Sequence, residues 1–301
     1  MKKIQFQLIL LFFACLLFFF PGTCIEGAKE GLLLWSGTIV PALLPFLVLT
    51  GLMNKYQTLH LLSWLFYPIY RKFPALNRDL AYTMILGLFC GYPLGAKIIN
   101  DLILSGSCTK KEGQCLLAVC NQVSPMFTIG YTLHLILNDK VPAPLFFLCL
   151  YAPGAVYFLY HAICLHREGF FCEHPGQPAR FPQKSLDEIL FDSLRSIFTI
   201  GIYIMIFSIG ANLLLSLPSF PPIDLLIGCL EITTGITHFG SLPLTLSQKA
   251  AALCAVSSFG GLCSAAQTAA VSRESRMSIS RYLCTKAVFS CLSGFLALLL
   301  F

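Results

Sequence analysis

Leu226-Ile-Gly-Cys-Leu-Glu-Ile-Thr-Thr-Gly-Ile236 places one carboxylate, Glu231, well inside an apolar stretch. A carboxylate at membrane depth costs at least about 2.5 kcal/mol, so it usually faces protein, a cavity or an ion. Two hydroxyl side chains, Thr233 and Thr234, follow it, and Gly235 comes next. Broken helices that carry a buried acid form the binding sites of many transporters. The stretch therefore predicts a discontinuous membrane helix with a polar site.

The composition is that of a membrane protein. Of the 301 residues, 56% are hydrophobic and 11% are charged, with a mean hydropathy of +0.77. Soluble domains carry about 25% charged residues. We therefore expect an all-α polytopic membrane protein that is embedded in the lipid bilayer. The apolar segments cover approximately 4–20, 31–53, 79–106, 113–137, 141–165, 186–217, 221–241, 246–271 and 280–301.

Lysines and arginines in the loops predict the orientation, because cytoplasmic loops are enriched in them. Lys2 and Lys3 place the N-terminus inside. Segments 79–106 and 221–241 fit this rule best as re-entrant hairpins, although either could be a full span. The loop cations then left outside are Lys29, Lys140 and Lys249. We expect a multi-pass protein of the cell (cytoplasmic) membrane with a cytoplasmic N-terminus. Cleavage of the first span stays open.

The order of the segments repeats along the chain. Residues 31–165 run span, hairpin, span, span, and residues 186–301 run in the same order but upside down. We predict an N-terminal membrane anchor at 1–30, a first repeat at 31–165, a cytoplasmic linker at 166–185 and a second repeat at 186–301. Inverted repeats with broken helices are typical of secondary transporters, whose site lies between the repeats.

Both halves carry a predicted break after the hairpin. Pro125 should remove a helix hydrogen bond in a span that also carries Asn121, Gln122 and Ser124. The freed carbonyl could coordinate an ion, or these side chains could simply bond neighbouring helices. The matching break in the second half is expected at 257–261. Its amides favour an anionic group, or its small residues only allow close packing.

Lys97 is expected to pair with Glu231 across the repeat interface or with Asp101 one turn away. Glu231 is a candidate carrier of a coupling proton or cation, or a hydrogen-bonded partner of a neighbouring broken helix. The candidate substrate or ion-binding residues are Glu231, Thr233, Thr234, Asn121, Gln122, Ser124, Ser257, Ser258, Gln267 and Lys97. The candidate hairpin and break residues are Gly91, Pro93, Gly95, Pro125, Gly235, Gly260 and Gly261.

Other functional classes lack their sequence signatures. The 14 cysteines include no Cys-x-x-Cys pair, so we expect no metal site and read them as small hydrophobes. The sequence has no His-Glu-x-x-His motif, P-loop or nucleophile elbow. We therefore expect neither an enzyme nor a cofactor. The net charge of +6 belongs to short loops between spans and does not indicate nucleic acid.

Four motifs resemble a known family. They are Gly91-Tyr-Pro-Leu-Gly-Ala-Lys97, Cys120-Asn-Gln-Val-Ser-Pro125, Leu230-Glu-Ile-Thr-Thr-Gly235, and Ser258-Phe-Gly-Gly261 with Gln267. Over roughly residues 31–300 they resemble the YlbJ-type sporulation integral membrane proteins. These belong to a group with the nucleoside-recognition or Gate domain, which nucleoside transporters and the membrane part of ferrous-iron transporters share.

The resemblance implies Gate-like repeats and a role in endospore formation, but it supplies no solute. Nucleoside binding is not carried over, because the hairpin residues typical of nucleoside transporters cannot be placed here one by one. We expect a secondary transporter or exporter of a small polar or charged solute needed for endospore formation. The alternative is a non-transporting scaffold or assembly factor for the spore cortex or coat. The sequence is compatible with a homo-oligomer as well as with a monomer.

Overall fold

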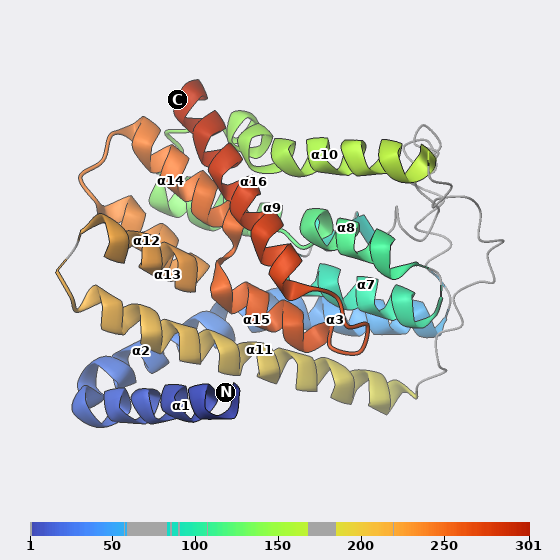
Figure 1. The fold of residues 1–301 in the computed structure, drawn as a ribbon, viewed down its shortest axis with the longest axis horizontal. Helices are drawn as coiled ribbons and strands as arrows, with labels where there is room; N and C mark the ends of the chain where they lie inside the picture. The colour runs from blue at the N-terminus through green and yellow to red at the C-terminus, as the bar shows by residue number, and fades with distance from the viewer. Residues whose placement is uncertain are drawn as a thin grey trace.

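The computed structural model describes residues 2–56, 58, 83–84, 86–89, 91–106, 108–167, 185–218 and 220–301. The regular elements in these residues are helices (Figure 1). Most of the predicted linker at 166–185 and much of the first arm of the 79–106 hairpin lie outside the described residues.

The first half of the chain forms α1 (Lys2–Phe19), α2 (Pro21–Leu34), the π-helical η1 (Trp35–Ile39), α3 (Val40–Lys55), α7 (Leu94–Leu104), α8 (Lys110–Cys120), α9 (Pro125–Phe127), the π-helical η2 (Thr128–Ile136) and α10 (Ala143–Arg167). The second half forms α11 (Leu186–Leu215), α12 (Pro221–Leu230), α13 (Ile232–Ser241), α14 (Leu246–Phe259), α15 (Gly261–Val271) and α16 (Ile279–Leu300).

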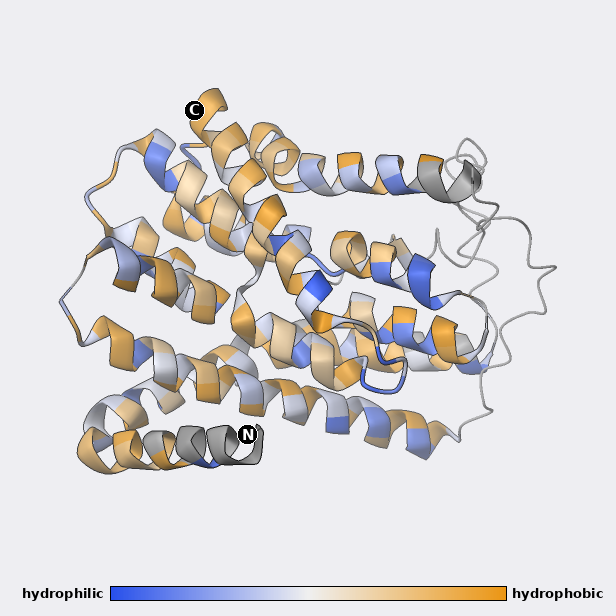
Figure 2. Cartoon of the chain, in the orientation of Figure 1, coloured by the Kyte–Doolittle hydropathy of each residue, from blue (hydrophilic) through white to orange (hydrophobic). Residues whose placement is uncertain are grey.

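Several helices are long and apolar enough to cross a membrane. In the described part of the chain there are four, at Ala143–His161, Leu186–Leu215, Leu246–Val271 and Ile279–Leu300. A bent pair, Pro21–Ile39 and Leu43–Met53, would make a fifth. Figure 2 shows hydrophilic residues near the starts of α8 and α11 and mostly apolar residues along the rest of these helices. The fold is therefore that of a multi-pass α-helical membrane protein.

Helix α11 illustrates that the outer surface of the helices is apolar. Its Ile197, Ile200 and Ile204 are buried against the protein. Its opposite face is also apolar, with Phe198 57% and Ile202 53% exposed. A helix that is hydrophobic on all sides is stable only inside a protein or in a membrane. The outer face of α11 therefore fits hydrocarbon rather than water.

Residues 21–30, predicted to connect two spans, are helical instead. Pro21 begins α2, at a position where a missing N–H costs nothing. Two glycines then let α2 pack closely along α11. A Cβ atom at Gly27 would lie 2.8 Å from Ile209 Cα, and one at Gly31 would lie 2.9 Å from Met205 Cα. Small residues allow such approach between membrane helices, so α2 continues through residue 30.

Helices α12 and α13 fold back on each other at Glu231. Asp224 of α12 and His238 of α13 form a hydrogen bond of 2.8 Å between Oδ1 and Nε2. A Cβ atom at Gly235 would lie 2.7 Å from Gly228 Cα, so the two backbones touch. Residues 221–241 therefore form a helical hairpin with its turn at Glu231.

The described parts of the first hairpin fold back in a similar way. A Cβ atom at Gly87 would lie 2.6 Å from the Cys120 carbonyl oxygen, and one at Gly95 would lie 2.7 Å from the same atom. The two arms therefore meet at one point on α8. The chain turns at Gly91, whose φ of +76° is readily available only to glycine.

A broken helix follows each hairpin. The first break lies slightly before its predicted position, and the second falls within its predicted range. Pro125 does not interrupt a helix, because it is the first residue of α9 and follows Ser124, whose Oγ caps Phe127 N at 3.2 Å. The break therefore precedes the proline. Ser257 and Ser258 lie in the last turn of α14. The second break falls at Gly260 and Gly261, which have φ of +80° and +82°.

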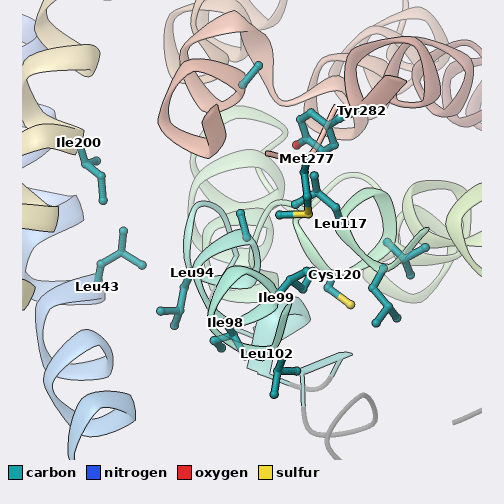
Figure 3. Packing of buried hydrophobic residues seen from close by; sticks show 14 of the residues in the cluster. Leu43, Leu94, Ile98, Ile99, Leu102, Leu117, Cys120, Ile200, Met277 and Tyr282 are labelled. Carbon is teal, nitrogen blue, oxygen red and sulfur yellow. The ribbon is translucent and has the colours of Figure 1, made fainter. Parts of the chain in front are cut away.

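Apolar packing connects the first hairpin to both halves of the chain. Figure 3 shows Ile99 of α7 beside Cys120 of α8, and Leu94 and Leu117 belong to the same cluster. Leu43 of α3 and Ile200 of α11 belong to the same cluster. This core therefore packs α7, which begins three residues after Gly91, against α3, α8 and α11.

The close approach of α12 and α13 gives a stability prediction. We expect Gly235→Ala to lower stability by about 1–3 kcal/mol, because the added methyl group meets the backbone of Gly228 and the helices must separate. Gly22→Ala is the control, since a Cβ atom there meets nothing within 4 Å. Thermal unfolding of the purified proteins in detergent measures both changes. Equal stability of the two variants would contradict the hairpin packing.

Candidate functional site

The two hairpin turns and the two helix breaks face one cavity of about 370 Å³. Each contributes lining residues, among them Gly91 from the first turn and Ser124 from the first break. Glu231 comes from the second turn and Gly260 from the second break. Other walls come from α2, η1, α3, α11, α13 and η2, through Leu34, Thr38, Ile39, Leu43, Ile200, Ile204, Thr233, Gly130 and Tyr131. Both halves of the chain therefore build the cavity.

Direct contacts hold the turns against the breaks. In the first half, Tyr92 N donates a hydrogen bond of 3.0 Å to the Gln122 carbonyl. In the second half, a Cβ atom at Gly261 would lie 3.1 Å from the Leu230 carbonyl oxygen. The halves meet where a Cβ atom at Gly260 would lie 3.2 Å from Tyr92 Cε1. A change in the angle between the halves would therefore change the cavity.

Glu231 caps the helix that it precedes. Its Oε2 accepts hydrogen bonds from Thr234 N at 2.7 Å and from Thr234 Oγ1 at 3.0 Å. A carboxylate at a helix N-terminus satisfies free amides and complements the helix dipole. Glu231 is only 3% exposed and lines the cavity. The local hydrogen bonds therefore hold a buried acid at the cavity wall.

Several other polar groups line the cavity and already have partners. Gln267 donates from Nε2 to Cys263 Sγ at 3.2 Å. Ser264 Oγ donates to the Gly261 carbonyl at 2.9 Å. Tyr131 Oη forms a 2.7 Å hydrogen bond with Thr237 Oγ1. Tyr92 differs, since its buried Oη has no hydrogen-bond partner among the residues that the structure describes. The cavity thus offers few strong polar groups besides Glu231.

A buried polar network lies at the first break. Asn121 Nδ2 donates to Thr268 Oγ1 at 2.7 Å and to Tyr282 Oη at 3.0 Å. Lys286 Nζ donates to Gln122 Oε1, and Lys286 is 0% exposed in the middle of α16. These bonds tie the break between α8 and α9 to α15 and α16. They connect the first half to the second through side chains more than a hundred positions apart.

The predicted candidates fall into three groups. Those that line the cavity are Glu231, Thr233, Ser124, Gln267, Gly91 and Gly260. Thr234, Asn121, Gln122, Ser257, Ser258, Pro93, Gly95, Pro125, Gly235 and Gly261 lie on the same hairpins and broken helices but not in the lining. Lys97 lies in α7 and lines a separate hollow of about 10 Å³, whereas the side-chain hydrogen bonds of Glu231 are with Thr234.

Sequence reasoning missed five residues of the site and its network: Tyr92, Tyr131, Thr268, Tyr282 and Lys286. Lys286 carried a signal, because it is a cation inside the apolar segment 280–301. Its position only five residues after Arg281 makes it resemble an end-of-span charge. The tyrosines and Thr268 carry no comparable signal, since such residues are common throughout membrane helices.

The hairpin turns and helix breaks meet at one cavity. This arrangement places the chain in the class of polytopic α-helical membrane proteins whose core contains discontinuous helices. The chain is similar to the sporulation integral membrane protein YlbJ of Bacillus subtilis (strain 168), with 25% identity over 293 residues, covering 84% of this chain and 72% of the relative. This similarity supports the YlbJ-type family, in agreement with the four motifs. No family model matches the chain, and no solved structure matches it.

Proposed function

We propose that the protein is a secondary transporter or exporter of a small polar or charged solute. The observation that carries this proposal is the meeting of two hairpin turns and two helix breaks at one cavity with a buried acid. Transporters with discontinuous helices bind substrate and coupling ions at such places, where unwound backbone and helix ends replace water. Glu231 is the proposed carrier of a coupling proton or cation.

In this proposal, residues 31–165 and 186–301 are inverted Gate-like repeats with re-entrant hairpins. Support comes from the order of the described helices, since in both halves a hairpin is followed by a broken helix and then by a long helix. Figure 1 supports opposite directions, since α10 ends at the right of the view where α11 begins, and α16 runs toward the left. The halves would rock about the contact between Tyr92 and Gly260, exposing the cavity to each side in turn.

The proposed orientation places the N-terminus and the basic turns in the cytoplasm. Gln114 of α8 exchanges hydrogen bonds of 3.1 and 2.7 Å with the backbone of Ser278. The turn at Arg273 and Arg276 therefore lies at the same end of the bundle as Lys110, at the start of α8. Clustering of basic residues on one side is typical of the cytoplasmic face.

The solute is proposed to serve endospore formation, because the similar protein is named for sporulation. The test is the count of heat-resistant spores in a sporulating strain that depends on this protein. Glu231→Gln removes the cavity charge, and we expect it to lower transport at least about tenfold, the factor that loss of one charge-assisted contact implies. Spore counts should fall accordingly.

Glu112→Gln is the matched control. Glu112 is also 3% exposed and also bonds a threonine and a backbone amide, here those of Thr109, but it lies at the start of α8 away from the cavity. Membrane levels of both variants are compared by immunoblot. If the Glu231→Gln protein accumulates normally and its strain still forms normal numbers of heat-resistant spores, the transporter proposal is contradicted. The alternative, a non-transporting scaffold for the spore cortex or coat, is then favoured.

A further inference from the structure

The described lining of the cavity carries one acidic side chain and no basic one. Glu231 is the only Asp or Glu among the described lining residues, and none of them is Lys, Arg or His. Salt bridges in the described part of the chain do not include Glu231. A ligand in this cavity therefore meets an excess of negative charge.

Only one of the two carboxylate oxygens of Glu231 accepts hydrogen bonds from the described residues. Both of its hydrogen bonds end on Oε2, and within the described residues no donor reaches Oε1. With 3% of its surface exposed, Glu231 has little access to bulk water. A buried carboxylate is costly unless it is paired or hydrogen-bonded. Oε1 therefore offers a place for a donor that the described part of the chain does not supply.

The walls beside this charge are aromatic and aliphatic. The rings of Phe127 and Tyr131 stack with centroids 5.1 Å apart, and both line the cavity together with Tyr92. Aromatic faces attract cations. Leu43, Ile200 and other aliphatic residues complete the walls, which favours a ligand with an apolar body.

We propose that the cavity binds a small organic amine in its ammonium form. The ammonium donates to Glu231 Oε1, and the apolar body of the ligand lies against the walls that include Phe127 and Tyr131. This inference takes the cavity as the solute site of the proposed function and adds the chemical class of the solute. Free amides at the second break would favour an anionic ligand. The carboxylate of Glu231 lies beside that break and would repel such a ligand.

Three probes of the same shape test the proposal: 2-phenylethylamine, 2-phenylethanol and phenylacetate. Isothermal titration calorimetry measures their binding to the purified full-length protein in detergent. We expect the amine to bind at least about tenfold more tightly than the alcohol, because a charge-assisted hydrogen bond contributes about 1.5–3 kcal/mol. Phenylacetate should bind most weakly. If the wild type shows no preference for the amine, including binding of none of the three, the proposal is overturned.

Two variants assign the preference to Glu231. Glu231→Gln should reduce amine binding to the level of the alcohol, whereas Glu112→Gln should keep the full preference. An amine preference that survives in folded Glu231→Gln protein also overturns the proposal.

Flux of the amine into proteoliposomes separates this inference from the proposed function. Selective binding without flux of the amine supports the cation site and counts against transport. If sporulation depends on Glu231 but the protein shows no preference for the amine, the cavity is functional and the proposed ammonium site is overturned.

Discussion

A tryptophan at position 130 should block the cavity without unfolding the protein. Gly130 lies in η2 and lines the cavity, and a Cβ atom there would meet nothing within 4 Å. The large ring of Gly130→Trp therefore has room at the cavity wall and should occupy space that the solute needs. We expect the heat-resistant spore count to fall to that of a strain lacking the protein.

Gly37→Trp is the matched control for this experiment. Gly37 also lies in a π-helical segment, η1, and its Cβ atom would also meet nothing within 4 Å, but it does not line the cavity. Changes in open space usually alter stability by less than about 0.5 kcal/mol, so both proteins should reach the membrane at wild-type levels. Normal spores from Gly130→Trp would show that the solute does not pass through this cavity.

The second large effect concerns the buried amine of Lys286. We expect Gln122→Leu to cost about 3 kcal/mol, because it leaves an amine without its acceptor inside the bundle. Lys286→Met should cost less, since methionine fills the same space and carries no group that needs a partner. The double variant should be more stable than Gln122→Leu alone, because it removes both ends of the pair.

Thermal unfolding in detergent measures these three proteins against the wild type. The order of stability is the decisive result: Gln122→Leu lowest, and the double variant above it. If Gln122→Leu is as stable as Lys286→Met, the hydrogen bond between these side chains does not hold the first break to α16.

The sequence predicted much of the architecture because its signals are local. The run around Glu231 is apolar except for one acid and two threonines, so a polar break in a membrane helix could be recognised without a structure. Gly91 and Gly260, which adopt positive φ, stood out for the same reason. The apolar segments likewise predicted where the helices lie along the described parts of the chain.

The remaining details depend on partners that are far apart in the chain. Asn121 and Gln122 were predicted as polar residues at a break, but their bonds to Tyr282 and Lys286 span more than 160 positions. Short sequence patterns cannot show which distant side chains meet. Helix α2 was missed because residues 21–30 include charges typical of a loop, whereas close packing of Gly27 on α11 favours a helix.

The most direct test of the account is the access of a membrane-impermeant thiol reagent to the cavity from each side. Thr233→Cys introduces a thiol at the cavity wall, in a background where all 14 native cysteines are replaced by alanine. Right-side-out and inverted vesicles then report access from the two faces. Ser257→Cys is the control, because Ser257 is 0% exposed and does not line the cavity. A transporter whose halves rock about a central site predicts labelling of Thr233→Cys from both faces and none of Ser257→Cys. Labelling of Thr233→Cys from one face only, or from neither, would contradict it.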